Sequence, residues 1–257
     1  MSHIKRFFLL IFSIYGFLIF VLLLFIIFPF VLISLLFNKT SSGNFIYSLC
    51  RLWADVAFFC WGFHHKNIGI ENVNKEKAAV YVFNHTSYMD IPVLMKAFRK
   101  QHIRILGKSS MASIPIFGVL YKNATIMVDR TSAENRANSI KELIRSLQKN
   151  ISVVIAPEGT FNMTPCPLKS FYDGAFKIAI ETQTPIVPVV FPDNYCRLNY
   201  HSVFSLNPGR TRAIFLREIS VENISMQELK QKVYNAMQNK LIELNAPWIN
   251  LNECSNS

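Results

Sequence analysis

The chain begins with a long apolar run, which is followed by shorter apolar stretches separated by amphipathic ones. No charged residue occurs among the 31 residues from Phe7 to Phe37. As one straight helix this run would be about 46 Å long, whereas the hydrocarbon core of a bilayer is about 30 Å thick. The run therefore predicts a segment that lies in or on a membrane.

The alternative for this run is a secretory signal peptide. Its apolar core would be about twice the usual length, and no small-x-small cleavage pattern follows it. Pro29 predicts a kink or the end of a helix, because proline lacks the amide hydrogen that an inner helical turn uses. A tilted span and a re-entrant helical pair both fit this pattern.

A second apolar segment, residues 45–65, is rich in aromatic side chains and carries only Arg51 and Asp55 as charged residues. Such a helix suits the membrane interface, where aromatic rings are buried and polar tips stay hydrated. The alternative is a core helix of the globular part of the chain.

After Lys66, short runs rich in β-branched and aromatic residues alternate with amphipathic stretches. The runs have the length of strands and lie at residues 78–83, 102–106, 124–128, 152–156, 185–191 and 212–219. Helices are expected at residues 90–100, 110–121, 133–149, 174–183 and 225–245. This alternation predicts an α/β fold, with a single mostly parallel sheet flanked by helices and active-site groups on the loops at strand ends.

The length of 257 residues allows one catalytic domain of ordinary size and about sixty further residues. We expect a membrane-anchoring helical segment at residues 1–65 and an α/β domain at residues 66–250. Residues 251–257 are expected to be a polar, frayed tail.

The net charge of +11 is concentrated in one part of the chain, since eleven basic and three acidic residues lie between residues 96 and 149. The sequence has no recognition helix, zinc-finger spacing or aromatic RNA-binding pattern, so nucleic acid is not expected as a partner. Anionic lipid or a phosphorylated substrate fits better, because basic residues beside an apolar anchor are attracted to acidic headgroups.

The five cysteines form no CxxC pair and are odd in number. Neither a disulfide framework nor a structural zinc site is indicated by this pattern. The resulting expectation is a domain in a reducing compartment, on the cytoplasmic face of the membrane.

The stretch NHTSYMD, residues 84–90, follows a predicted strand and places His85 five positions before Asp90. Pro92 suits only the first turn of a helix, so the helix is expected to start close to Tyr88 or Asp90, after His85. The carboxylate can then accept a hydrogen bond from one ring nitrogen while the other takes a proton. A catalytic dyad is one interpretation, and a helix-capping aspartate beside an ordinary loop histidine is the other.

Two further features could hold an anion. The turn formed by Glu158, Gly159 and Thr160 offers a carboxylate, a glycine that admits close backbone approach, and a hydroxyl. Lys108 and Arg130 each follow a predicted strand, so two cations at the same end of neighbouring strands could hold a phosphate. The alternative for the two cations is a solvated surface pair.

Together these features resemble the four ordered motifs of the glycerolipid acyltransferases, in particular the lysophosphatidic acid acyltransferases. The matching stretches are His-x4-Asp at residues 85–90, the Lys-to-Arg block at residues 108–130, PEGT at residues 157–160 and PIVPVV at residues 185–190. The resemblance covers residues 80–191, and the apolar start of the chain is also similar to that family.

The resemblance implies transfer of a fatty acyl chain from an acyl carrier protein or coenzyme A thioester to the free hydroxyl of lysophosphatidic acid, which gives phosphatidic acid. It implies that His85 is the general base on that hydroxyl and that Asp90 orients His85. No metal or other cofactor is expected, because a thioester is already activated and needs only a positioned base and stabilisation of the oxyanion.

The resemblance also implies how the substrates are held. Lys108 and Arg130 would bind the phosphate of the acceptor. The turn of Glu158, Gly159 and Thr160 would help to shape the acceptor site. The stretch around residue 188 would belong to the side that receives the acyl donor.

The sequence departs from the family pattern near the acceptor site. Phe161 stands where the family usually has arginine, and Tyr172 and Asp173 stand where a basic residue is usual. Lys169 or Arg197 could compensate. The alternative acceptor is a lysolipid without phosphate, such as a lyso-aminolipid. Two other classes remain as alternatives, a lipid-binding protein without catalysis and a thioesterase that uses water.

Overall fold

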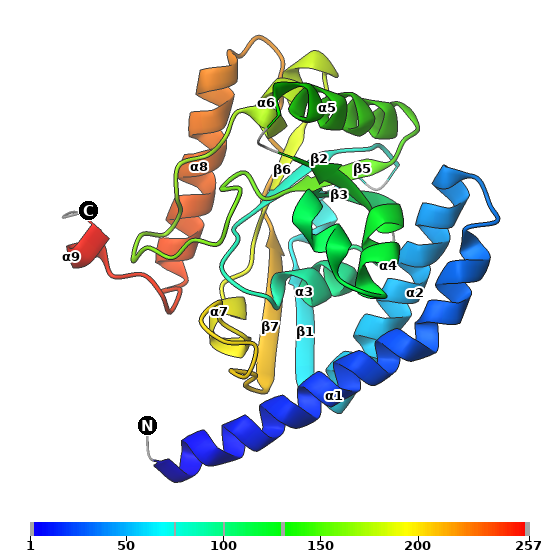
Figure 1. The fold of residues 1–257 in the computed structure, drawn as a ribbon. Coiled ribbons are helices and arrows are strands. Elements are labelled where there is room, and N and C mark those ends of the chain that lie inside the picture. Colours follow the sequence, from blue (N-terminus) through cyan, green and yellow to red (C-terminus); the bar gives the residue numbers. More distant parts are fainter. Residues whose placement is uncertain (1–2, 75, 100, 130–131, 255–257) are drawn as a thin grey trace.

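The computed structural model describes residues 3–74, 76–99, 101–129 and 132–254. Within these residues, one sheet of seven strands forms the centre, in the order β1-β7-β6-β2-β5-β3-β4 (Figure 1). The strands are β1 (Phe63–Ile68), β2 (Val80–Phe83), β3 (Ile103–Lys108), β4 (Thr125–Val128), β5 (Ser152–Ile155), β6 (Ile186–Val190) and β7 (Gly209–Phe215). All six strands predicted from the sequence are present.

The sheet is mostly parallel, as predicted. Among the described strands, β6 and β7 form the one antiparallel pair, so that β7 and β1 run opposite to the others. The sequence analysis did not predict β1. Its sequence FHHKNI lacks an apolar run, and it is an edge strand held by backbone pairing to β7 with alternate side chains exposed.

The helices connect the strands and cover the sheet. They are α1 (His3–Ser34), α2 (Lys39–Cys60), η1 (Ile70–Asn72), α3 (Asp90–Ala97), η2 (Ser109–Ser113), α4 (Phe117–Ala124), α5 (Ala133–Gln148), α6 (Gly174–Glu181), α7 (Asn194–Arg197), α8 (Met226–Glu243) and α9 (Leu251–Cys254), where η marks a 3₁₀ helix. The expected helices are present, except that the one at residues 110–121 is divided into η2 and α4. Pro115 lies at this break.

The two faces of the sheet bury separate apolar clusters. Along β2, Tyr81 and Phe83 belong to one apolar cluster, whereas Val80 and Val82 belong to the other. The first cluster includes side chains of α1 to α4 and the second includes side chains of α5, α6 and α8, the helices that cover the sheet in Figure 1. This alternation follows from the two-residue period of a strand. Because both faces are covered, the central strands β2, β5 and β6 are buried along their whole length, and polar groups of the site lie on the loops that follow them.

The apolar run at the start of the chain forms α1, a continuous helix that contains Pro29. Pro29 therefore does not end the helix, because Ile27 and Val31 on either side pack into the cluster shared with α2. Among the described residues, the segment Arg6–Ser34 is the one helix long and apolar enough to cross a membrane. Only 17% of its most apolar window is buried, unlike the core helix of a soluble protein.

The aromatic segment at residues 45–65 forms most of α2. It is partly a core helix, as one of the two interpretations predicted, and it also has an exposed apolar face. One face, with Ile46, Trp53 and Ala54, is buried against the sheet and α1. The other face leaves Leu52 and Phe59 exposed. A helix with one buried and one exposed apolar face suits a position between the globular core and a lipid surface.

The structure contradicts the expectation that the cysteines form no disulfide, because Cys166 and Cys254 are bonded. The residues are 88 positions apart, and the contact depends on the end of the chain packing against the loop before α6. Asn250 donates its amide hydrogen to the carbonyl of Pro165, and the Trp248 indole donates to the carbonyl of Cys166. Residues 248–254 are therefore tied to this loop, whereas residues 255–257 of the expected tail lie outside the described residues. The cysteine pattern no longer supports a reducing compartment.

The division into an anchor at residues 1–65 and an α/β domain at residues 66–250 stays a prediction. The sheet begins at Phe63, before the predicted boundary, and the apolar cluster of α1 and α2 is continuous with the side chains of β2. The helical pair and the sheet thus share one core.

Candidate active site

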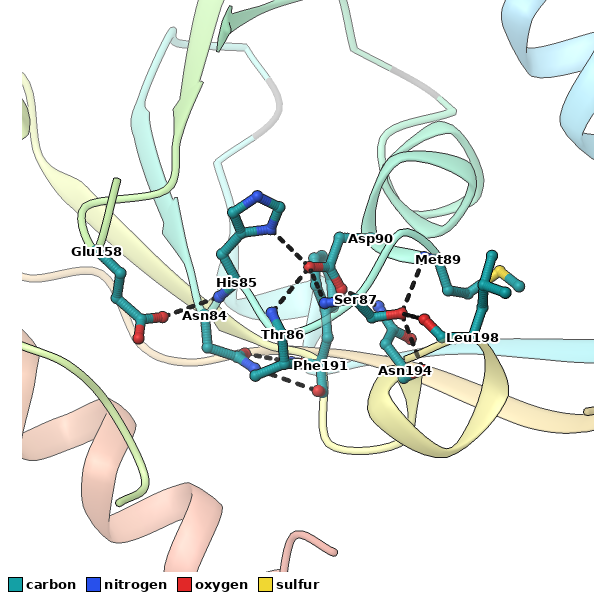
Figure 2. Close-up of polar contacts among 10 residues, drawn as sticks. All are labelled: Asn84, His85, Thr86, Ser87, Met89, Asp90, Glu158, Phe191, Asn194 and Leu198. Atoms are coloured by element: carbon teal, nitrogen blue, oxygen red, sulfur yellow. Dashed lines mark hydrogen bonds and ion pairs between the residues drawn. The ribbon is translucent and has the colours of Figure 1, made fainter. Parts of the chain in front are cut away.

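The loop after β2 is tied to the loop after β6 by the buried side chain of Asn84. Its amide oxygen accepts the Phe191 amide hydrogen at 2.7 Å, and its amide nitrogen donates to the Phe191 carbonyl at 3.3 Å (Figure 2). Neighbouring parallel strands end at the same edge, so β2 and β6 deliver these loops side by side. This pairing fixes the backbone on which His85 stands.

His85 and Asp90 lie in direct contact, as the sequence predicted. The Nδ1 atom of His85 is 2.8 Å from Oδ2 of Asp90 (Figure 2). The Asp90 side chain is fully buried, whereas 23% of the His85 side chain is exposed. Since Nδ1 faces the carboxylate, Nε2 is the ring nitrogen that remains for a substrate, and it makes no hydrogen bond to the described residues.

Asp90 accepts further hydrogen bonds from both sides. Its Oδ2 accepts the backbone amide hydrogens of Thr86 and Ser87 at 3.1 Å each, and its Oδ1 accepts from the side-chain amide of Asn194 at 2.7 Å (Figure 2). Asp90 is also the first residue of α3. The capping interpretation is therefore wrong, because Met89 occupies the N-cap position of α3 and the Asp90 carboxylate binds amide hydrogens of the loop before the helix. The contact with His85 agrees with the other interpretation, whose catalytic role stays a prediction.

Glu158, on the loop after β5, is buried, and both of its carboxylate oxygens accept hydrogen bonds from backbone amides. Its Oε1 accepts the amide hydrogen of His85 at 2.8 Å, and its Oε2 accepts that of Lys169 at 2.9 Å. Burial raises the pKa of Glu158 to about 7, and the two backbone hydrogen bonds offset part of this effect. The carboxylate thus ties the loop after β2 to two parts of the loop between β5 and α6, and it holds the backbone of His85.

Glu158→Gln is expected to remove a pH dependence of stability. With a pKa near 7 in the folded chain and an ordinary value when unfolded, Glu158 holds a proton in the folded state over a range where the unfolded state has lost it. Its contribution is greatest below about pH 4.5 and falls by about 3 kcal/mol as the pH rises to about 7. The melting temperature in detergent should fall as the pH rises from about 4.5 to about 7, and it should fall less in Glu158→Gln than in the wild type.

The control for this variant is Glu222→Gln, which changes an exposed carboxylate. Its melting temperature should follow the wild-type pH dependence. If Glu158→Gln and the wild type showed the same slope between pH 4.5 and 7, the buried carboxylate would not titrate in this range.

An aromatic wall covers the imidazole of His85. The ring centroid of Phe161 is 4.3 Å from that of His85, 5.0 Å from that of Tyr88 and 6.2 Å from that of Tyr200. The residue that departs from the family pattern is therefore in contact with the histidine itself. Its ring makes the surroundings of the imidazole more apolar.

Of the two cations predicted to bind phosphate, the structure describes the position of Lys108 only. Lys108 is exposed at the end of β3, two strands from β2, a separation of about 10 Å. Arg130 lies outside the described residues. Of the two residues considered as compensation, Arg197 donates to the carbonyl of Pro208 at 2.6 Å. Lys169 instead places its ammonium 2.7 Å from Oγ1 of Thr160.

The remaining predicted positions are Gly159 and Thr160, on the loop after β5, and Pro188, within strand β6. Gly159 has a φ of 76°, a left-handed conformation that favours glycine, so the turn after β5 requires this residue. Thr160 is exposed beside it. Pro188 lies within the buried strand β6, where its carbonyl accepts the Leu216 amide hydrogen. Its assignment to the donor side stays a prediction.

The sequence analysis missed two asparagines of the site. Asn84 joins two loops and Asn194, the first residue of α7, holds the far oxygen of Asp90. Asn84 directly precedes His85, and a polar residue at the end of a buried strand was a usable signal. Asn194 is 104 positions from Asp90, so no local pattern indicates their contact.

This arrangement defines an α/β protein in which a histidine and a buried carboxylate lie in contact at the edge of a mostly parallel sheet. The chain belongs to the acyltransferase family, whose sequence pattern, described as Acyltransferase, matches residues 64–192. It is therefore an acyltransferase, as the sequence motifs predicted.

The chain is also similar in sequence to individual proteins named as acyltransferases. The chain is 28% identical over 199 residues to a chloroplastic 1-acyl-sn-glycerol-3-phosphate acyltransferase of Arabidopsis thaliana, covering 76% of this chain and 54% of that one. It is 28% identical over 171 residues to the 1-acyl-sn-glycerol-3-phosphate acyltransferase of Haemophilus influenzae, covering 65% of this chain and 69% of that one. The chain thus spans about half the length of the plant relative.

A solved structure supports the fold. The 1-acyl-sn-glycerophosphate acyltransferase PlsC of Thermotoga maritima superposes with a TM-score of 0.75, covering 97% of this chain and all of that one. The sequence identity is 21%, so this similarity shows the fold alone. The mostly parallel sheet with an apolar helix at the start of the chain is common to both.

Proposed function

We propose that the protein transfers a fatty acyl chain from a thioester to the free hydroxyl of lysophosphatidic acid, which yields phosphatidic acid. The observation that carries the proposal is the 2.8 Å contact between His85 and the buried Asp90, with Nε2 left for a substrate. Family membership and the names of the two relatives support this reaction and this acceptor.

The proposed mechanism has two steps. Nε2 of His85 takes the proton of the acceptor hydroxyl while the oxygen bonds to the thioester carbonyl carbon, which gives a tetrahedral intermediate. The intermediate then collapses, the carbon–sulfur bond breaks, and the departing sulfur takes the proton from the imidazolium. Asp90 keeps Nδ1 protonated and stabilises the transient positive charge. The products are an ester and a free thiol.

Lys169 is the cation that we propose for the phosphate of the acceptor, together with Lys108 and Arg130. Its ammonium lies beside Thr160, one residue before Phe161, where the family usually has arginine. A lysine offers a point charge without the paired geometry of a guanidinium, so the phosphate would be held less rigidly. Lys169 also belongs to the network of His85, through the backbone bond to Glu158.

One observation favours a second acceptor, a lysolipid without phosphate such as a lyso-aminolipid. Phe161 covers His85 with an aromatic ring at the position of the usual arginine. An apolar wall there stabilises an uncharged part of the acceptor better than a phosphate, whose desolvation would be unfavourable.

The carrier of the donor is proposed as acyl carrier protein or coenzyme A, and the protein is proposed to act at a bilayer from its cytoplasmic face. The exposed apolar side chains of α1 and α2 support the association with a bilayer. A lipid acceptor and a lipid product are both accessible to an enzyme that lies at such a surface.

The experiment that tests the function offers one labelled acyl thioester and a panel of lysolipids to the purified full chain in detergent. We expect acylated lysophosphatidic acid as the main product by mass. In Lys169→Met, the KM for lysophosphatidic acid should rise about tenfold, because a charged hydrogen bond contributes about 1.5 kcal/mol, while the KM for the thioester stays unchanged.

The matched control is Lys177→Met, which removes an exposed lysine from α6. It should leave both KM values unchanged. Preferential acylation of a lysolipid without phosphate would replace lysophosphatidic acid by the second acceptor. Acyl release that is independent of any lysolipid would indicate a thioesterase, and binding without turnover would indicate a lipid-binding protein.

A further inference from the structure

A basic pocket lies between the start of α2 and the end of α5, where the strands β3 and β5 begin. It encloses about 220 Å³. Its polar lining includes four cations and one carboxylate, namely Lys39, Arg104, Arg145, Lys149 and Glu142. The strands β3 and β5 run toward the edge that holds His85, so the pocket is at the opposite edge of the sheet. It is therefore separate from the candidate active site.

Arg104 lines the pocket and is the most buried of its four cations, with 7% of the residue exposed. It donates to the carbonyl oxygens of Ile103 and Thr40 and to the side-chain oxygen of Asn44, all of which are neutral. A buried charge without an ionic partner is unfavourable unless an opposite charge approaches it. Burial accordingly lowers the pKa of Arg104.

The backbone of α2 is shaped to admit this cation. Gly43 faces the guanidinium, and a Cβ atom there would lie 2.7 Å from Nη2 of Arg104. The first turn of α2 contains no acidic residue, and the neutral side chain of Asn38 caps the Ser41 amide, so the positive end of the helix adds to the field of the pocket. Lys39 and Lys149 are exposed lining residues of the pocket. Lys39 is paired with Glu142 at 2.9 Å, and Lys149 donates to the hydroxyl of Thr40 at 3.2 Å.

We propose that this pocket binds the phosphate group of an anionic phospholipid headgroup. The position of the pocket argues for a lipid rather than a soluble anion. Leu36 and Phe37, on the turn just before Lys39, are 85% and 55% exposed, so apolar side chains lie beside the mouth. A lipid bound here would place its phosphate among the cations and its chains against the apolar surface of α1 and α2.

The test uses the full chain in nonionic detergent micelles doped with dioctanoyl phosphatidylglycerol, which is neither substrate nor product of the proposed reaction. Binding is measured by the change in intrinsic tryptophan fluorescence or by calorimetry. We expect phosphatidylglycerol to bind at least about tenfold more tightly than dioctanoyl phosphatidylcholine or inorganic phosphate. Equal affinity for inorganic phosphate would make it a soluble-anion site and overturn the lipid assignment.

Three variants locate the binding. Arg145→Gln combined with Lys149→Gln, both exposed side chains, should weaken phosphatidylglycerol binding about tenfold. The control pair Lys141→Gln and Lys177→Gln removes the same charge from positions outside the pocket and should not change it. Glu142→Gln removes the carboxylate of the pocket and should strengthen binding severalfold, a gain that misfolding cannot produce. Equal losses in both pairs, or no gain in Glu142→Gln, would overturn the proposal.

Discussion

His85→Ala is expected to lower the rate of acyl transfer by about 10²- to 10⁴-fold, because the acceptor hydroxyl would lose its general base. The nitrogen that is removed, Nε2, is the one that faces away from Asp90. The loss should appear in kcat, while the KM values for the thioester and the lysolipid change little. Initial rates with labelled thioester in detergent measure both quantities.

The control for this variant is His102→Ala, which removes an exposed histidine at the entry to β3. It should retain the wild-type rate. The fraction of His85→Ala protein found in the membrane fraction should also match the wild type, since His85 does not belong to the apolar surface of α1 and α2. Near wild-type turnover of purified His85→Ala would exclude the general-base role.

Asp90→Asn is expected to have an effect of similar size, about 10²- to 10⁴-fold in kcat. Asparagine preserves the volume, but its amide nitrogen must replace one of the two carboxylate oxygens. At the Oδ1 position it would face the side-chain amide of Asn194, which is itself a donor. At the Oδ2 position it would face the amide hydrogens of Thr86 and Ser87 and also Nδ1 of His85. The imidazole would then have to accept there and carry its proton on Nε2, where the base is required. The tautomer would then be wrong for catalysis.

This variant must be separated from a loss of folding. Its melting temperature is measured in the same detergent, and its pH–rate profile is compared with that of the wild type. The control is Asp173→Asn, which changes a largely exposed aspartate paired with Lys230. A folded Asp90→Asn protein with the wild-type rate and pH profile would show that Asp90 serves only to order the loop before α3.

The comparison of sequence and structure is informative at β1 and at Cys166. β1 escaped prediction because an edge strand needs no apolar run, and its residues pair with β7 through backbone groups. The disulfide escaped because spacing along the chain says nothing about two cysteines that meet only when the end of the chain packs on a distant loop. The pairing of β1 with β7 and the bond between Cys166 and Cys254 both join residues that are far apart in the sequence.

Glu158 and Phe161 show the same limit within the site. The sequence placed a carboxylate on the loop after β5, but only the packed loops direct both of its oxygens to backbone amides. The sequence also showed a phenylalanine in place of an arginine. The fold is what brings that ring to 4.3 Å from the imidazole of His85.

The sequence by itself determined the six apolar strands that alternate with helices, the apolar start of the chain, and the local His-x4-Asp pair, because these depend on periodicity and on neighbours a few residues apart. The tertiary structure decided which distant groups complete the site. Asn194 reaches Asp90, Glu158 reaches His85, and Arg104 is buried beneath α2. Such contacts form between residues far apart in the chain, and packing of the loops and helices against one sheet brings them together.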